Sequence, residues 1–324
     1  MPRELPENRG NQNLSRLLER TIIGYVRPDA QITAIESLRM GEHGGMSGAP
    51  LARFRVTYHT PFGEANAITL IAKRAGLCER RVLALLCKQR QAVPFSHTLD
   101  LKTDEPMLVC QQDLTDDSDA QNRPTVAGEE AQRLAHIHYA NLGKAEALSW
   151  LPRANRPYFE GLIVADFRRQ LAKAMERPGF VAEYADLAHE MAEAIEPFLA
   201  TMEELRGVGP LTLIHGDLHN GNIRLHRGQP YFLDWEHASY GSLYLDLPNH
   251  FTLADALLYR DALAGDGCDI PQGQFIERYR QAGRYVGFKY MGFLPHSWMN
   301  GWTSSIRGPL LDQLLHGGGA VSPA

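Results

Sequence analysis

The amino-acid sequence predicts an α+β fold in two parts, a small part that contains a sheet and a larger part that is mainly helical. The chain has 324 residues, which is more than one ordinary hydrophobic core holds and suits two domains or lobes. Segments with the composition of strands gather before residue 113, and long helical patterns follow it. We therefore expect domains of residues 1–112 and 113–324.

The smaller part mixes helix and strand patterns. Apolar side chains recur at helical spacing in residues 13–25 and 79–89. β-branched and aromatic side chains predict strands at residues 32–38, 52–60, 67–72 and 106–111. A glycine-rich stretch, residues 41–48, lies between the first two predicted strands.

The larger part begins with an acidic, polar linker and then has long helical patterns. We expect helices at residues 128–142, 162–175 and 180–205, and mostly helix from residue 253 to 316. Two short apolar segments, residues 211–214 and 231–233, interrupt them and are expected to form a strand pair.

Charge and composition narrow the class of protein. The net charge is −5, which gives no support for binding nucleic acid. Residues 1–180 carry 24 Lys and Arg against 21 Asp and Glu, whereas residues 181–324 carry 9 against 17. The acidic second half favours a cationic substrate, and acidic solvent-facing sides of soluble helices would give the same count.

Targeting signals are not evident in the sequence. The first 13 residues are polar, and no stretch of about 18 apolar residues occurs, so we expect neither a secretory signal nor a membrane span. The four cysteines lie far apart without the spacing of metal ligands, as is typical of reduced thiols. We therefore expect a cytoplasmic protein.

The strongest motif is His-Gly-Asp-Leu-His-Asn-Gly-Asn at residues 215–222, which follows a short apolar segment. A second apolar segment ends at Asp234. Phosphoryl transfer needs one carboxylate that orients an acceptor hydroxyl and takes its proton, and Asp217 fits this role. It also needs a carboxylate and an amide that hold Mg²⁺ on the nucleotide phosphates, and Asn222 and Asp234 fit these roles.

A zinc site is the alternative interpretation of the same motif. His215, Asp217 and His219, with His226, have plausible ligand chemistry. Zinc binding does not account for Asn222, and it leaves the second carboxylate after the motif unexplained. We therefore favour phosphoryl transfer.

The motif followed by Asp-Trp-Glu at residues 234–236 resembles the catalytic and metal-binding loops of the aminoglycoside phosphotransferase and choline kinase group. The resemblance implies a two-lobed protein-kinase-like fold, with a small antiparallel-sheet N-lobe at residues 1–112 and a mainly helical C-lobe at residues 113–324. It also implies ATP and Mg²⁺ bound between the lobes, with GTP as the alternative nucleotide.

Further segments resemble the nucleotide site of that group. The glycine-rich stretch resembles its nucleotide-covering loop, in which Gly45 and Ser47 would approach the phosphates. Lys73 resembles the lysine that contacts the α- and β-phosphates, and Glu79 the glutamate that holds it; Arg74 is the competing assignment for Lys73. The hinge between the lobes, which would contact the adenine through its backbone, matches Gln111, Gln112 and Asp113.

The resemblance also implies supporting residues around the catalytic loop. Asp246 matches a carboxylate that braces this loop through backbone N–H groups, and His215 and His219 are expected to fix its geometry. Glu236, two residues beyond Asp234, is expected near the metal or the acceptor. About a dozen residues separate Asp234 from Asp246, too few for the activation loop of a protein kinase.

These features predict an ATP-dependent enzyme that phosphorylates a hydroxyl group of a small molecule. We expect a cationic antibiotic, such as an aminoglycoside or a basic peptide, and hence a role in antibiotic resistance. The first alternative is a metabolic kinase of choline, an amino alcohol, a sugar or homoserine. The second is a nucleotide-binding pseudokinase, which the intact Asp217, Asn222 and Asp234 disfavour. No nucleic acid or membrane partner is expected.

Overall fold

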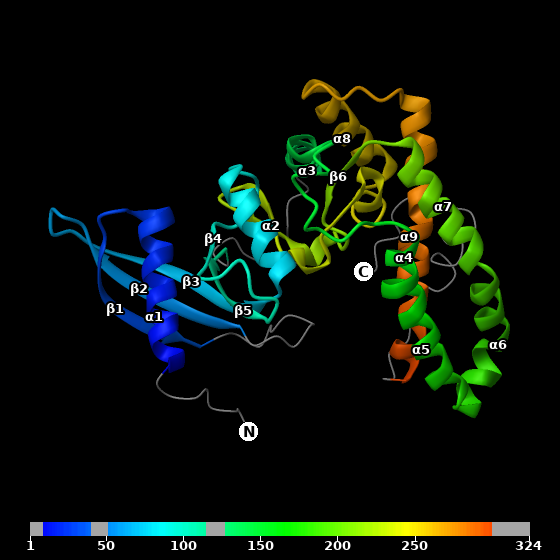
Figure 1. The fold of residues 1–324 in the computed structure, drawn as a ribbon, viewed down its shortest axis with the longest axis horizontal. Coiled ribbons are helices and arrows are strands. Elements are labelled where there is room, and N and C mark those ends of the chain that lie inside the picture. The colour runs from blue at the N-terminus through cyan, green and yellow to red at the C-terminus, as the bar shows by residue number, and fades with distance from the viewer. Residues whose placement is uncertain (1–8, 40–50, 115–126, 300–324) are drawn as a thin grey trace. The chain divides into compact units, whose positions relative to one another are not determined.

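The computed structural model describes residues 9–39, 51–114 and 127–299. The chain forms two compact units (Figure 1): unit 1 comprises Met1–Pro124 and Ile223–Glu236, and unit 2 comprises Thr125–Asn222 and His237–Ala324. The expected domains of residues 1–112 and 113–324 differ from these units chiefly because residues 223–236 belong to unit 1. The predicted loop with Gly45 and Ser47 lies outside the described residues.

Unit 1 contains a five-stranded antiparallel sheet in the order β1-β2-β3-β5-β4. Its strands are β1 (Gln31–Leu38), β2 (Ala52–His59), β3 (Ala65–Ala75), β4 (Ser96–Thr98) and β5 (Met107–Gln112). The four strands expected from composition are confirmed. Strand β4 was not expected, because three residues are too few to show alternation.

The hydrophobic core of unit 1 forms between the sheet and helix α1 (Arg9–Thr21), which Figure 1 draws in dark blue across the strands. Leu17 and Leu18 of the helix are at most 1% exposed and belong to one cluster with Val56 and Leu70 of the sheet. Helical spacing on α1 and alternation on the strands thus place apolar side chains in the same core. This packing supports β3, which carries Lys73.

Helix α2 (Leu77–Lys88) follows β3 directly and is held by a buried arginine. The side chain of Arg80 has no exposed surface, and its guanidinium donates hydrogen bonds to the backbone carbonyls of Asp100, Thr103 and Glu105. These bonds satisfy a charged group that would otherwise be costly to bury. They also fasten α2 to the segment that leads into β5.

A hairpin of β7 (Ile223–His226) and β8 (Gln229–Phe232) completes unit 1. Its two-residue turn has positive φ at both Arg227 (52°) and Gly228 (73°), as hairpin turns of this length require. The N–H of Phe232 donates to the carbonyl of Ala92 at 2.8 Å, which joins the hairpin to the rest of the unit.

The expected pairing of residues 211–214 with residues 231–233 is wrong. Strand β6 (Leu211–Ile214) pairs with β9 (Ser239–Ser242), and β8 pairs with β7. The local turn closes the β7–β8 hairpin, so β8 finds its partner within a few residues. An Arg-Gly turn lacks the Asn or Asp that usually announces such a hairpin in a sequence.

Unit 2 is mainly helical, as expected. Its α-helices are α3 (Ala127–Asn141), α4 (Arg156–Phe159), α5 (Ala165–Met175), α6 (Pro178–Glu193), α7 (Ile195–Val208), α8 (Leu253–Gly265) and α9 (Gln272–Met299). The single helix expected at residues 180–205 is two helices, divided at Ala194. Pro197 lies in the first turn of α7, where its missing N–H costs no helical hydrogen bond.

Aromatic side chains fix helix α9 in unit 2. The ring of Phe288 stacks on Phe198 of α7 with centroids 4.6 Å apart, and it meets the edge of Phe167 of α5 at 5.6 Å. Tyr285, one turn earlier on α9, packs against Phe159. Such pairs add to the energy of area burial, so α9 is anchored along the face that carries Tyr285 and Phe288. No helix in the described parts of the chain is long and apolar enough to span a bilayer.

Substitution of Arg80 by methionine should destabilise unit 1, because it leaves three backbone carbonyls without a buried donor. We expect the free energy of unfolding to fall by roughly 2–4 kcal/mol. The measurement is denaturant unfolding followed by circular dichroism. Arg81→Met is the matched control, since Arg81 is the next residue of the same helix, is only partly buried, and donates to the carbonyl of Leu101. Equal losses in the two variants would contradict the role assigned to Arg80.

Candidate active site

Lys73 is the centre of a charged cluster in unit 1. It lies near the end of β3, and its Nζ is 2.6 Å from Oε1 of Glu79 and 2.8 Å from Oδ1 of Asp234. The side chains of Lys73 and Glu79 are 13% and 3% exposed, so this pair is largely shielded from water. The lysine therefore joins β3 and the adjacent helix α2 to the turn after β8, where Asp234 lies 161 residues further along the chain.

The charges of this cluster shift its pKa values. Burial alone would lower the pKa of Lys73, but Glu79 and Asp234 outweigh burial, and the pKa is raised. Burial raises the pKa of Glu79, against the ammonium of Lys73, and the negative charges of Asp234 and Glu236 add to the rise. One ammonium thus faces a surplus of carboxylates, which favours binding of a further cation.

Arg74 has a different environment from its neighbour Lys73. Its side chain is exposed, and Nη1 donates to the carbonyl of Pro106 at 3.1 Å. Successive side chains of a strand point to opposite faces, so Arg74 and Lys73 cannot serve the same cluster. The geometry favours Lys73 over Arg74 as the phosphate-binding residue.

Asp234 stands in a strained backbone conformation. Its φ is +61°, in the left-handed region that few residues other than glycine adopt, although aspartate tolerates it better than most. The next residue, Trp235, is fully buried, and its Nε1 donates to the carbonyl of Phe232 at 3.2 Å. The buried indole therefore holds the turn that presents Asp234 to Lys73.

In unit 2, Asp246 holds the start of the catalytic loop. Its carboxylate is buried and accepts the N–H of His215 at 2.6 Å and the N–H of Gly216 at 2.8 Å. Nε2 of His138 lies 3.2 Å from Oδ2. Burial alone would raise the pKa of Asp246, but His138 and the loop outweigh it, and the pKa is lowered. The ionised carboxylate therefore fixes two consecutive N–H groups.

Gly216 is the one position in this loop where only glycine fits. Its φ is +76°, and a Cβ there would lie 2.5 Å from the carbonyl oxygen of His237. Both the left-handed backbone and the close approach exclude a side chain. The residue that follows this turn is Asp217.

Asp217 is the loop residue expected to orient the acceptor hydroxyl and to take its proton. Its carbonyl accepts a hydrogen bond from Nδ2 of Asn222 at 2.9 Å, and its Oδ1 forms a close ion pair with Nζ of Lys289. Burial alone would raise the pKa of Asp217, but Lys289 outweighs it, His219 and His237 act in the same direction, and the pKa is lowered. The carboxylate is therefore ionised at neutral pH.

The two loop histidines accept backbone hydrogen bonds. Nδ1 of His215, which is fully buried, accepts the N–H of Asp217 at 3.3 Å, and Nδ1 of His219 accepts the N–H of Gly221 at 3.0 Å. Each imidazole thus closes a turn with the residue two positions later. This geometry fits the loop-fixing role expected of both.

The segment expected to contact adenine already uses part of its backbone. The N–H of Gln112 donates to the carbonyl of Phe95 at 3.0 Å, and the N–H of Asp113 donates to a carbonyl of β3 at 3.3 Å. Asp113 is buried with its Oδ2 2.5 Å from Nε of Arg53, and Gln111 is buried as well. A nucleotide base would therefore have to use other backbone groups of this segment.

Asn222 and Asp234 have the donor chemistry for Mg²⁺. The Nδ2 of Asn222 donates to a carbonyl, so its amide oxygen is the atom that would ligate a metal, and Asp234 has a partly exposed carboxylate. Mg²⁺ in such enzymes takes one or two protein ligands and completes its shell with phosphate oxygens and water. Within the described ranges, no group of three or more His, Cys, Asp or Glu is arranged for a metal, so zinc gains no support.

Two residues of helix α9 that touch the loop were not expected from the sequence. The hydroxyl of Tyr285 donates to the carbonyl of Gly216 at 2.7 Å, and Nζ of Lys289 lies 3.3 Å from the same oxygen. Both residues belong to a helix of mixed polarity, in which a lysine is ordinarily solvated. The one sequence signal that links the two residues is their spacing of four, which places them on one helix face.

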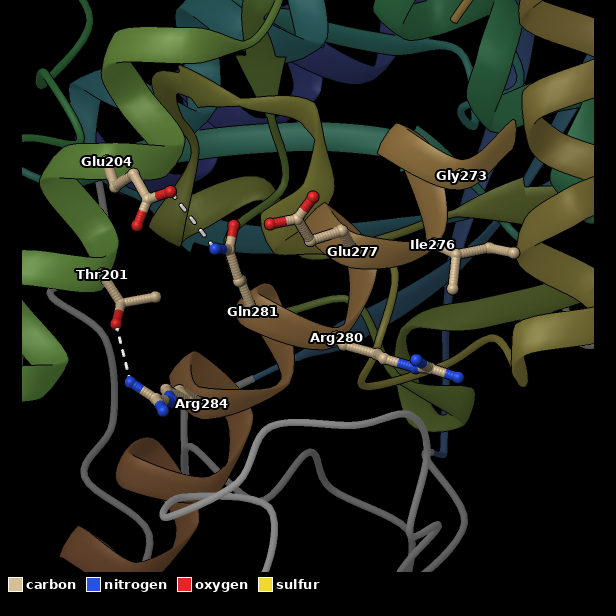
Figure 2. Close-up of a pocket in the computed structure, with 8 residues that line it drawn as sticks. All are labelled: Thr201, Glu204, Gly273, Ile276, Glu277, Arg280, Gln281 and Arg284. Carbon is tan, nitrogen blue, oxygen red and sulfur yellow. Dashed lines mark hydrogen bonds between the residues drawn. The ribbon is translucent and has the colours of Figure 1, made fainter. Parts of the chain in front are cut away.

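A groove between α7 and α9 has a volume of about 310 Å³. Figure 2 shows its lining: Thr201, Glu204, Gly273, Ile276, Glu277, Arg280, Gln281 and Arg284. Nη1 of Arg284 donates to Oγ1 of Thr201 at 3.0 Å, and Gln281 donates to Glu204 at 3.3 Å. None of the expected site residues lines this groove, and Lys289 lies further along α9.

The catalytic loop and the charged cluster of Lys73 are accompanied by a direct match to a family. The model of the phosphotransferase enzyme family matches residues 71–293, a range that includes Lys73, Asp217, Asp234 and Asp246. The chain belongs to this family. It is therefore a small-molecule phosphotransferase with a hydroxyl group as acceptor. No curated protein matches its sequence.

Solved structures share the fold of this phosphotransferase at low identity. An ethanolamine kinase from Plasmodium vivax is 12% identical with a TM-score of 0.53, covering 95% of this chain and 88% of that chain. The streptomycin–ATP–APH(2″)-IIa complex is 11% identical with a TM-score of 0.50, covering 97% of each. A GDP complex of a mutant aminoglycoside 2′-phosphotransferase-IIIa is 14% identical with a TM-score of 0.50, covering 93% and 96%. These likenesses confirm the two-lobed kinase-like fold.

Asp246→Asn should destabilise the phosphotransferase in a pH-dependent way. Because the folded-state pKa of Asp246 is lowered, its stabilising effect is complete above the unfolded pKa of about 3.9 and is lost as the pH falls through the folded value. We expect the variant to lose roughly 2–4 kcal/mol of unfolding free energy at pH 7. The difference from the wild type should shrink below about pH 4.

The measurement is denaturant unfolding at a series of pH values. Asp186→Asn, at an exposed position of α6, is the control and should match the wild type throughout. A loss for Asp246→Asn that is the same at pH 3 and pH 7 would show that its charge is not what holds the loop.

Proposed function

We propose that the chain is an ATP-dependent O-phosphotransferase, with GTP as the alternative nucleotide. The observation that carries the proposal is the Lys73 cluster, in which Nζ contacts both Glu79 and Asp234 within 2.8 Å. An ammonium held in this way can bind phosphate oxygens without losing its position. The nucleotide in the APH(2″)-IIa complex is ATP, and in the other aminoglycoside phosphotransferase complex it is GDP.

The residues proposed to bind the nucleotide phosphates and those proposed to activate the acceptor belong to different units. In unit 1, Lys73 binds the phosphates and Glu79 orients it. In unit 2, Asp217 orients the acceptor hydroxyl and receives its proton, while Asp246 fixes the loop. Asn222 and Asp234 would hold Mg²⁺, which neutralises charge on the phosphates when it is bound.

The reaction balances without a further reactant. The acceptor O–H bond breaks and its proton passes to Asp217, while the acceptor oxygen forms a bond to the γ-phosphorus. The bond between that phosphorus and the β–γ bridging oxygen breaks, and ADP leaves with the electron pair. Most of the rate enhancement comes from positioning and from electrostatic stabilisation of the transferred group.

The acceptor is a small hydroxyl compound, and two observations bear on its charge. The acidic second half of the chain supports the cationic antibiotic expected from the sequence, and streptomycin is the compound in the APH(2″)-IIa complex. The immediate surroundings of Asp217 are instead basic, with Lys289, His219 and His237. A neutral hydroxyl compound such as a sugar suits these surroundings better than choline or an amino alcohol, because an ammonium group there would meet like charge.

Asp217→Asn should abolish phosphoryl transfer while sparing nucleotide binding, because the amide cannot take the hydroxyl proton. We expect kcat to fall by roughly 10²–10⁴-fold. Basic antibiotics, choline, amino alcohols, sugars and homoserine are screened for ATP-dependent gain of one phosphoryl group by mass spectrometry, and Mg·ATP binding is followed by calorimetry. Asp186→Asn is the control. The proposed function fails if no compound gains phosphate, or if Asp217→Asn turns over as fast as the wild type.

Lys73→Met should weaken nucleotide binding, because it removes a charged donor to the phosphates. The expected rise in the Kd for Mg·ATP is about 10- to 100-fold. Arg74→Met, on the opposite face of the same strand, should change the Kd less than about twofold. Calorimetry measures both, and circular dichroism checks that both variants fold. A larger effect from Arg74→Met would transfer the phosphate role to Arg74.

A further inference from the structure

Lys289 places a positive charge beside the carboxylate proposed to activate the acceptor. Its Nζ forms a close ion pair with Oδ1 of Asp217 and lies 3.3 Å from the carbonyl oxygen of Gly216. The side chains of Lys289 and Asp217 are 26% and 22% exposed, so water screens the pair only in part.

The position of Lys289 is set by its helix. Tyr285 lies one turn earlier on α9, is buried, and donates its hydroxyl proton to the carbonyl of Gly216 at 2.7 Å. Phe288 stacks on Phe198 of α7 with centroids 4.6 Å apart. The helix is therefore held over the turn that precedes Lys289, and the ammonium of Lys289 is presented to the catalytic loop by anchored backbone.

The other charged groups that act on Asp217 have the same sign when protonated. Nε2 of His219 lies 3.9 Å from Oδ2, and His237 acts on the carboxylate from the segment after the metal-binding turn. Lys289 holds Oδ1, so Oδ2 is the oxygen that can receive the acceptor hydroxyl. An ammonium group next to that hydroxyl would lie within a few ångströms of Lys289 and would compete with it for the same carboxylate.

We propose that Lys289 is a specificity-determining residue that excludes a cationic group beside the reacting hydroxyl. The acceptor is thus a hydroxyl compound that is neutral or anionic around its reacting carbon, such as a polyol or a hydroxy acid. This inference rests on the proposed function, because it concerns the acceptor of that same reaction.

The test uses probe alcohols that differ in charge on the same scaffold: glycolate and glycerate, ethylene glycol and glycerol, ethanolamine and choline. They are assayed with Mg·ATP alongside sugars, homoserine and aminoglycosides. For the wild type we expect kcat/KM at least about tenfold higher for the anionic or neutral member than for the ammonium member of a set. Lys289→Met should remove most of this preference, and Lys289→Arg should retain it.

The control must remove a positive charge from α9 without approaching Asp217. Arg280→Met is the matched control, because Arg280 is an exposed cation on the groove side of the same helix (Figure 2).

The outcomes separate the two proposals. If ammonium compounds are the better acceptors of the wild type, or if Lys289→Met does not change the charge preference, the role of Lys289 is overturned while the phosphotransferase activity stands. If no compound of any charge gains phosphate, the proposed function fails and this inference fails with it. Lys289→Arg keeps the test decisive should Lys289→Met not fold.

Discussion

Ionised carboxylates held by surrounding donors are the interaction on which the site depends, and Asp246 is the fullest example. Taking this charge out of water is costly, and two loop N–H groups with His138 offset that cost at distances of 2.6–3.2 Å. The N–H groups belong to His215 and Gly216, the residues directly before Asp217. The buried carboxylate of Asp246 thereby fixes the geometry of the loop at Asp217, the carboxylate proposed to act on the acceptor.

In unit 1 the buried charge is positive, and carboxylates stabilise it. Lys73 is mostly buried, and Glu79 and Asp234 keep it charged. Asp234 can join this cluster because the β7–β8 hairpin belongs to unit 1, although it begins about 110 residues after the last strand of the sheet, at Ile223 against Gln112. The Arg227–Gly228 turn and the buried Trp235 thus set the position of the Asp234 carboxylate against the Lys73 ammonium, the two groups proposed to bind metal and phosphate.

The sequence indicates residues that chemistry constrains and misses residues that packing alone brings together. Asp217, Asn222 and Asp234 stand out because phosphoryl transfer needs these groups in this order. The strands of the sheet stand out because their side chains alternate over six or more residues. Strand β4 is too short for such a pattern, and the β6–β9 pairing depends on which segments the hairpin leaves free. Lys289 lies 72 residues from its partner, and no periodicity encodes a contact made by a single side chain.

Sequence and structure also differ in what they indicate about the charge of the acceptor. The excess of acidic residues after position 180 is a property of composition, and solvent-exposed charges are largely screened beyond about 10 Å. Lys289 touches the reacting carboxylate and is only 26% exposed, so its effect at the acceptor site is local and weakly screened. Distant acidic residues can raise the concentration of a cation near the protein, but they cannot offset an ammonium already paired with Asp217. The local charge therefore decides which hydroxyl compound is accepted.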